Sequence, residues 1–164
     1  MIGKITKGAN FSGLADYLTR DGRGDVLALD GLASSTPAEA ASEMQVAASI
    51  STRCQQPVLH VSIAYAPGET PTDDEARSDA RAVLAGLGLA GHQAVIVRHR
   101  DKDHEHIHVM ANRVGEDGRA VSDSGSYGRV ERVLRRIEAE RGLTVTEGRH
   151  APSPITGNRF EVRW

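Results

Sequence analysis

Four of the seven histidines in this chain lie within ten residues, in the run HRDKDHEHIH at positions 99–108. Imidazole nitrogens are common ligands of catalytic metals, and they leave open coordination positions when only three are present. The segment 105–114 alternates polar and apolar residues, so a strand there places His106 and His108 side by side on one face. The spacing therefore predicts a metal site built on this strand.

His99 is the candidate for a third metal ligand. It ends an expected strand over 93–99, and a short charged turn around Asp101-Lys102-Asp103 joins this strand to the next one as a hairpin. Three convergent imidazoles repel one another when protonated unless something binds them, which argues against an incidental polar strand face. Because the apolar face packs on helices, we expect His106 and His108 to point into a cleft or solvent.

His60 and Ser62 share one face of an expected strand over 58–65, and this face is polar where the opposite one is apolar. They are candidates for a functional surface, although a polar outward face is also the ordinary state of a half-buried strand. The remaining histidines are expected to be surface or packing residues: His92, His104 and His150.

Tyr17 is a candidate nucleophile in an expected short helix. At about 100° per residue, its side chain lies roughly 110° from the centre of the apolar stripe, on a flank where a phenol reaches solvent or a cleft. Tyr65 falls on the core face of its strand and Tyr127 at a helix start, so both are weaker candidates. The stripe consists of Phe11, Leu14, Ala15 and Leu18.

The composition is that of a soluble globular protein, with 39% hydrophobic and 26% charged residues. There is no apolar run near the roughly 20 residues of a membrane helix and no signal-peptide core, so we expect a cytoplasmic protein without membrane insertion. The single cysteine, Cys54, excludes an internal disulfide and a cysteine zinc site. The net charge of -2 argues against a basic DNA-binding surface, but a bound metal cation adds local positive charge.

Helices and strands alternate along the chain in the order β-α-β-α-β-α-β-β-α. Capping boxes at Thr36 and Thr72 begin two of the helices. This order predicts an α+β fold, a mainly antiparallel sheet of about five strands with helices packed on it. Strands are expected over 1–7, 25–30, 58–65, 93–99 and 105–114, and helices over 11–20, 37–50, 73–88 and 127–141.

Three short motifs follow one another along the chain. The first is FSGLADYL, from Phe11 to Leu18; the second is His60-Val61-Ser62 followed by Pro67-Gly68-Glu69. The third is HxDxDxxHxHxxxNR, from His99 to Arg113. In order and residue types, these motifs resemble those of the P-type plasmid mobilisation relaxases, members of the HUH endonuclease superfamily. The resemblance covers roughly residues 1–145.

The resemblance implies a palm-like HUH relaxase domain over residues 1–150, with 151–164 as an unassigned tail, and transesterification on single-stranded DNA. The motif tyrosine, Tyr17, attacks the scissile phosphate and leaves a free 3′ hydroxyl and a 5′-phosphotyrosyl link. A divalent ion, Mg²⁺ or Mn²⁺, is held by histidine ligands and orients the phosphate for attack. The implied ligands are His99, His106 and His108.

The resemblance also implies roles for other motif residues. Asp103 or Asp101 can accept a hydrogen bond from a ligating imidazole, which makes Asp103 a catalytic candidate, or either can be a turn aspartate. Arg113 can contact a phosphate or be an ordinary exposed strand arginine. The implied DNA-binding residues are Ser62, His60, Asn112 and Arg113.

The implied activity is metal-dependent, site- and strand-specific nicking at a plasmid transfer origin, which initiates conjugative mobilisation. The implied partners are single-stranded DNA, an accessory DNA-binding protein and a type IV secretion coupling protein. One alternative is a rolling-circle replication initiator, disfavoured because Tyr17 precedes the histidines. Another is a metal- or DNA-binding module that has kept the fold without nicking, which the near-neutral charge favours. The third alternative is a small histidine-metal phosphodiesterase or oxygenase. Such an enzyme would keep its activity when Tyr17 is replaced by Phe.

Overall fold

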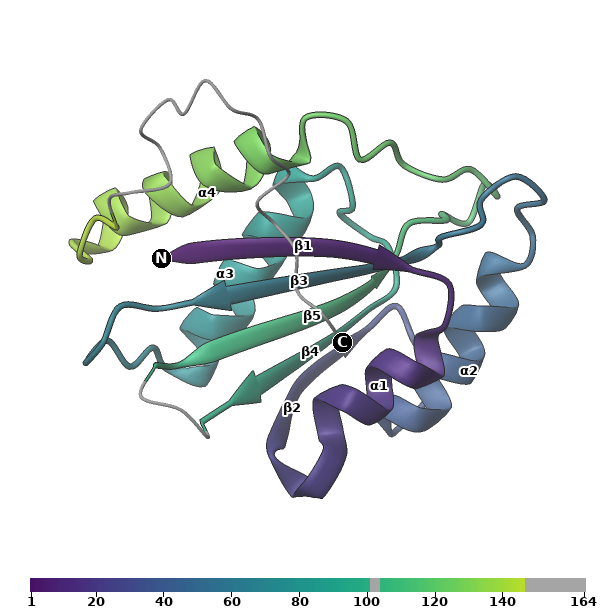
Figure 1. Ribbon diagram of the computed structural model, residues 1–164, viewed down its shortest axis with the longest axis horizontal. Helices are drawn as coiled ribbons and strands as arrows, with labels where there is room; N and C mark the ends of the chain where they lie inside the picture. The colour runs from purple at the N-terminus through teal and green to yellow at the C-terminus, as the bar shows by residue number, and fades with distance from the viewer. Residues whose placement is uncertain (101–103, 147–164) are drawn as a thin grey trace.

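A computed structural model describes residues 1–100 and 104–146, which form a five-stranded antiparallel sheet and four α-helices (Figure 1). The strands lie in the order β1-β3-β5-β4-β2. The predicted α+β class and order of elements are confirmed, while the expected tail over 151–164 lies outside the described residues. The strands are Ile2–Gly8 (β1), Gly24–Asp30 (β2), Val58–Ala64 (β3), Ala94–His99 (β4) and His106–Asn112 (β5); the helices are Phe11–Thr19 (α1), Pro37–Ala48 (α2), Asp73–Gly86 (α3) and Ser126–Arg141 (α4).

Local capping contacts begin the helices where the sequence predicts them. The Thr72 side chain accepts a hydrogen bond from the Glu75 backbone, and the Glu75 carboxylate accepts one from the Thr72 backbone, which completes the capping box of α3. The Thr36 side chain caps α2 by accepting from the Glu39 backbone, but the Glu39 carboxylate accepts from the Ser35 backbone, so the capping box expected at Thr36 is not completed. Such short-range contacts depend on a few neighbouring residues, so the sequence itself predicts where these helices begin. None of the helices in the described part of the chain is long and apolar enough to span a membrane.

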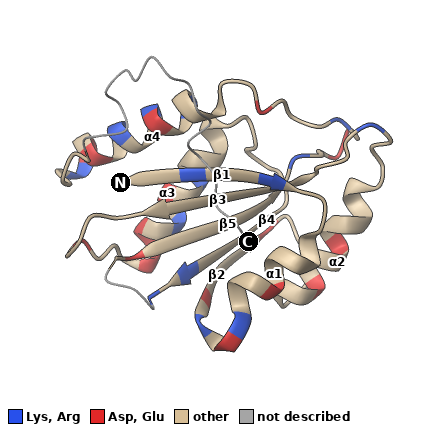
Figure 2. Ribbon diagram, viewed as in Figure 1, with Lys and Arg blue, Asp and Glu red and all other residues tan. Residues whose placement is uncertain are grey.

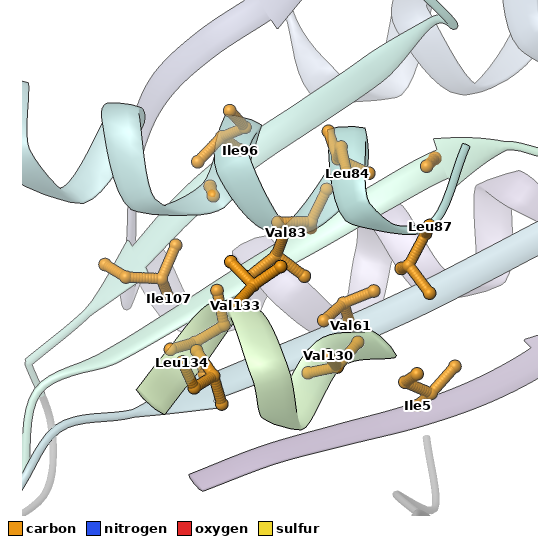
Figure 3. Packing of buried hydrophobic residues seen from close by; sticks show 14 of the residues in the cluster. Ile5, Val61, Val83, Leu84, Leu87, Ile96, Ile107, Val130, Val133 and Leu134 are labelled. Atoms are coloured by element: carbon orange, nitrogen blue, oxygen red, sulfur yellow. The ribbon is translucent and has the colours of Figure 1, made fainter. Parts of the chain in front are cut away.

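Helices cover both faces of the sheet, whereas the sequence analysis expected them on the apolar face alone. Helices α3 and α4 pack on the face that carries Val61 and Ile107, and Figure 3 shows Val83 of α3 and Val133 of α4 over these strands. Helices α1 and α2 pack on the opposite face. That second face is apolar at one end only, since β3, β4 and β5 contribute Val58, Val95, Val97 and Met110 to it.

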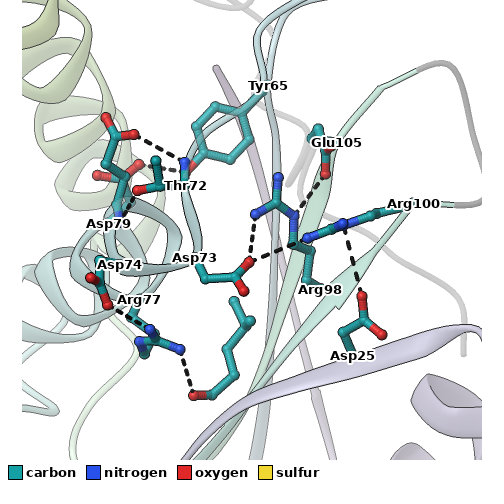
Figure 4. A network of polar contacts seen from close by, with 12 residues as sticks. Asp25, Tyr65, Thr72, Asp73, Asp74, Arg77, Asp79, Arg98, Arg100 and Glu105 are labelled. Atoms are coloured by element: carbon teal, nitrogen blue, oxygen red, sulfur yellow. Dashed lines mark hydrogen bonds and ion pairs between the residues drawn. The ribbon is translucent and has the colours of Figure 1, made fainter.

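Arg98 of β4 ties the β4–β5 hairpin to helix α3 (Figure 4). Its guanidinium group is 2% exposed and donates to the Glu105 carboxylate at 2.9 Å and to the Asp73 carboxylate at 2.8 Å. Glu105 directly precedes β5, and Asp73 is the first residue of α3. A buried cation thus holds the start of the histidine strand in place.

Replacement of Arg98 by Met is expected to lower the free energy of unfolding by about 2–3 kcal/mol, because it leaves the Glu105 carboxylate without its partner. This value is below that of a fully buried pair because Asp73 is half exposed. Urea denaturation measures the change. The matched control is Arg100→Met, because Arg100 is exposed and reaches the same Asp73 carboxylate, and it should cost no more than about 0.5 kcal/mol. If both variants lose the same free energy of unfolding, Arg98 does not hold the hairpin to α3 as proposed.

Candidate functional site

Strand register brings the predicted histidine triad together on one face of the sheet. His99 of β4 pairs directly with His106 of β5. Two residues further along β5, His108 pairs with Ser62 of β3. Directly paired residues point to the same side of an antiparallel sheet, so all four side chains share a face. This face is also the one on which α1 and α2 pack, and the last turn of α1 reaches His99.

The imidazole rings contact one another and the backbone of α1. The ring centroids of His99 and His108 are 4.3 Å apart, and those of His106 and His108 are 6.2 Å apart. His99 donates from Nε2 to the Leu18 carbonyl oxygen at 2.7 Å, so the lone pair of its neutral ring is on Nδ1. His108 Nδ1 lies 2.9 Å from His60 Nε2, so this contact engages Nδ1 and not Nε2 of His108.

Burial keeps the imidazoles of His60 and His108 neutral. His99 and His108 are buried and not solvent-facing as the sequence analysis allowed, while His106 is half-buried. Burial lowers the pKa of His108 to about 2, helped by the charges of the neighbouring histidines and Arg23. Burial, with the charge of His99, lowers the pKa of His60 to about 4. Neutral imidazoles expose the lone pairs that a metal ion requires.

The donor set fits a divalent metal in its chemistry. As the side chains stand, no three His, Cys, Asp or Glu groups within residues 1–100 and 104–146 converge on a single ion. His99, His106 and His108 nevertheless form one cluster, and the contact of His99 with a carbonyl oxygen is the kind that orients a metal-bound imidazole. Asp101 and Asp103, the expected partners of a ligating imidazole, lie outside the described residues.

The three tyrosines of the chain lie in different environments, and only Tyr17 is on the histidine side of the sheet. Tyr17 is half-buried in α1 and packs at the edge of the core formed by α1 and α2. Tyr127 packs against the opposite core, with α3 and α4. Tyr65 is 3% exposed and donates its hydroxyl hydrogen to Asp79, and burial raises its pKa. Tyr17 is therefore the tyrosine that can act with the histidines.

Arg23 is a site residue that the sequence analysis missed. It donates from Nη2 to the Tyr17 carbonyl oxygen at 2.7 Å, and its guanidinium carbon lies 4.9 Å from the centroid of the Tyr17 ring. Its charge also contributes to the low pKa of His108, after burial and the neighbouring histidines. A basic residue in a glycine-rich turn directly after the tyrosine helix, DGRG at 21–24, is the signal that points to it.

Gly24 permits the close contact between α1, β2 and the histidines. A Cβ atom there would lie 2.5 Å from the Leu18 carbonyl oxygen and 2.6 Å from Val97 Cγ1. Gly24 also pairs directly with His99 in the sheet. Because only glycine avoids these clashes, the carbonyl end of α1 can lie against His99.

Two expected DNA-binding residues lie at the histidine cluster. Ser62 is 6% exposed and is paired with His108 on one side and Lys4 of β1 on the other. Lys4 therefore adds a positive charge to this face, and Figure 2 shows blue segments along β1. His60 is fully buried and bonded to His108, so it supports that imidazole and does not face a ligand.

The other two expected DNA-binding residues lie at the far end of β5. Asn112 is fully buried and donates its amide to the Met44 carbonyl and to Gln93. Arg113 donates to the carbonyl oxygens of Val121 and Gln56. The structure does not bring this pair to the histidine cluster, because an extended strand rises about 3.3 Å per residue.

Comparisons with known proteins agree with this geometry. The family model described as "Relaxase: MobA/VirD2-like, nuclease domain" matches residues 17–143, a range that includes Tyr17 and the histidine triad. Two Escherichia coli proteins, each called Protein TraI, are also similar. One is 31% identical over 112 residues, which cover 65% of this chain and 15% of that protein. The other is 36% identical over 55 residues, which cover 34% of this chain and 8% of that protein.

The chain thus spans a small fraction of the length of these curated relatives. A solved structure described as "Molecular Basis of Vancomycin Resistance Transfer in Staphylococcus aureus" matches with a TM-score of 0.53 at 11% identity. The match covers 88% of this chain and 94% of that one. At this sequence identity, the similarity shows that the two chains share a fold.

Proposed function

Because this chain belongs to the MobA/VirD2-like relaxase nuclease-domain family, we propose that it nicks single-stranded DNA at a plasmid transfer origin through Tyr17. The observation that carries the proposal is the placement of Tyr17, the one tyrosine on the histidine face, with the Arg23 guanidinium over its ring and the next residue, Leu18, bonded to His99. A positioned nucleophile, a fixed cation beside it and a cluster of potential metal ligands on the same face suit a phosphoryl transfer.

In the proposed reaction the Tyr17 oxygen attacks the scissile phosphorus and the bond from phosphorus to the 3′ oxygen breaks. The phenol loses its proton and the departing 3′ oxygen gains one, so the products are a 3′ hydroxyl and a 5′-phosphotyrosyl link. The new ester keeps the energy of the diester, so a 3′ hydroxyl can later attack it and rejoin the strand. The contact of Arg23 with the Tyr17 backbone and ring holds the nucleophile during the attack.

His99, His106 and His108 would hold the divalent ion of this reaction, with His60 and the Leu18 carbonyl fixing two of the rings. When bound, the ion supplies positive charge to the non-bridging phosphate oxygens. Imidazole donors favour Mn²⁺ over Mg²⁺, whose preferred ligands are oxygens. We propose Asp103 as a hydrogen-bond partner of one ligating imidazole.

We propose that Ser62 and Lys4, which share the histidine face, contact the DNA backbone near the scissile phosphate. The proposed setting is the cytoplasm, where an accessory DNA-binding protein and a type IV secretion coupling protein act with the relaxase on the transfer origin.

A covalent-adduct assay tests the proposed function. Labelled single strands that tile the transfer and replication origins of the replicon carrying this gene are incubated with the protein and Mn²⁺ or Mg²⁺. A band of protein-linked DNA on a denaturing gel, formed with a transfer-origin strand and lost on chelation, is the expected result. Adduct only with replication-origin strands would identify a replication initiator, and no adduct with any strand would contradict nicking.

Replacement of Arg23 by Gln is expected to slow adduct formation roughly 10- to 100-fold, because it removes a charged donor worth about 1.5–3 kcal/mol beside Tyr17. Arg23→Lys should recover part of the rate, since the positive charge over the ring is kept. Single-turnover rates at saturating DNA measure the effect. Arg20→Gln is the matched control, because Arg20 lies in the same turn but pairs with Asp16 at the surface. Similar rates for both glutamine variants would exclude Arg23 from the site.

A further inference from the structure

A second hollow lies beyond the ends of β3 and β5 that are away from the histidines. It has a volume of about 860 Å³ and runs between the segment 51–56 and the hairpin 113–120. Three of its lining residues are arginines and none is acidic: Arg53, Arg113 and Arg119. Figure 2 shows blue segments in these loops, at the upper right of the view. We refer to this hollow as the arginine groove.

The arginines of the groove differ in how they are held. Arg113 is fixed by hydrogen bonds to the carbonyl oxygens of Val121 and Gln56, and Asp123 lies 4.0 Å from it. Arg53 and Arg119 are exposed, one on each wall. Within the described part of the chain, neither guanidinium group forms an ion pair or a hydrogen bond. Among the described residues, neither positive charge on the groove walls is therefore taken up by a direct ion pair; the Asp117 carboxylate of the hairpin accepts from the Arg119 backbone and not from its guanidinium group.

Short-range contacts hold the hairpin wall in place. Val114 and Ala120 form a bridge, and the Gly115 amide donates to the Arg119 carbonyl oxygen at 3.0 Å. At the tip, Gly118 has a φ of 75° and lies so close to the turn after α2 that a Cβ atom would be 2.9 Å from Ile50 Cγ2. The hairpin thus presents Arg119 from a fixed position opposite Arg53.

The charge of the groove contrasts with that of the chain, which carries a net charge of -2. Guanidinium groups bind phosphate oxygens in a bidentate manner, and a groove of this size accommodates more than one phosphate. Its distance from the cluster is about 17 Å along β5, as five residues separate His108 from Arg113. A strand of several nucleotides covers that distance, within the roughly 4–16 nucleotides of known single-strand sites.

We propose that the arginine groove binds the phosphodiester backbone of the same DNA strand whose scissile phosphate lies at the histidine cluster. The inference rests on the proposed function. Arg53 and Arg119 each contact one phosphate, and the groove supplies affinity that the acidic chain as a whole lacks. These contacts carry no base specificity, because phosphates are common to every sequence.

The test uses the full chain, Arg53→Gln combined with Arg119→Gln, and a fluorescent oligothymidine of about 30 nucleotides. Fluorescence anisotropy over a series of KCl concentrations gives the slope of log K against log salt. Loss of two phosphate contacts is expected to reduce the slope by about 1.4, at about 0.7 per contact on a single strand, and to weaken binding roughly 10-fold. The matched control combines Arg132→Gln and Arg136→Gln, two exposed arginines of α4.

Adduct formation on the same variants separates this inference from the proposed function. With a strand that the wild-type protein nicks, the groove variant should need about 10-fold more DNA for half-maximal rate but keep its rate at saturation. A salt slope and DNA requirement equal to those of the α4 control would overturn the groove proposal while nicking still stands. If the wild-type protein forms no adduct, the proposed function fails, and the salt slope alone decides whether the groove binds DNA.

Discussion

Tyr17→Phe should abolish the covalent protein–DNA adduct, with a loss of at least roughly 1000-fold, because phenylalanine has no oxygen to attack phosphorus. The phenyl ring still fits beside Arg23, whose contacts are with the ring and the backbone carbonyl of residue 17. The fold and DNA affinity should therefore be unchanged. A denaturing gel measures the adduct, and fluorescence anisotropy measures binding of the same labelled strand.

Tyr127→Phe is the matched control for this variant. Tyr127 is also half-buried in a helix but packs on the opposite face of the sheet, with α3 and α4, so its loss should leave the adduct unchanged. If the adduct persists in Tyr17→Phe, or disappears in Tyr127→Phe alone, the nucleophile is a residue other than Tyr17. Tyr65 is a poor alternative because its hydroxyl is buried and bonded to Asp79.

His106→Ala is expected to lower metal-supported adduct formation at least about 100-fold and to weaken Mn²⁺ binding, since it removes one of three proposed ligands. His106 is half-buried, whereas His99 and His108 are buried, so its truncation should disturb the fold least. A higher Mn²⁺ concentration should restore part of the rate. Isothermal titration of Mn²⁺ into each variant measures binding without any dependence on DNA cleavage.

His104→Ala provides the control, because His104 is two residues away, is half-buried like His106, and its ring centroid lies 6.2 Å from that of His106. It should bind Mn²⁺ and form adduct as the wild-type protein does. If both alanine variants bind Mn²⁺ with unchanged affinity, the three-histidine ligand set is wrong. If only His104→Ala loses the metal, the ligand set includes His104 in place of His106.

Features that depend on neighbouring residues could be predicted from the sequence. The order of helices and strands is confirmed because capping contacts such as that of Thr72 with Glu75 span a few residues. The alternation that places His106 and His108 on one face follows from the period of two of any strand. The motif resemblance to relaxases is confirmed at the level of the family.

Features that depend on contacts between distant segments could not be predicted in the same way. Periodicity gives the two faces of a sheet but not which helices cover them, so the sequence analysis left the histidine face open to a cleft or solvent. In the structure α1 and α2 pack on the same face, and His99 and His108 are buried beneath the end of α1. Likewise, Asn112 belongs to the histidine motif in sequence yet lies at the other end of β5, with its amide bonded to α2.

The sequence by itself determined the elements, the histidine pair at 106 and 108, and the tyrosine helix, since each depends on local periodicity or a short motif. Only the tertiary structure decided that hairpin register pairs His99 with His106 and that Tyr17 shares the histidine side of the sheet. It alone also placed the Arg23 guanidinium over the Tyr17 ring and, through Gly24, brought β2 against the carbonyl end of α1. Such placements depend on the register of strands and on close approach between chain segments, which no local pattern in the sequence encodes.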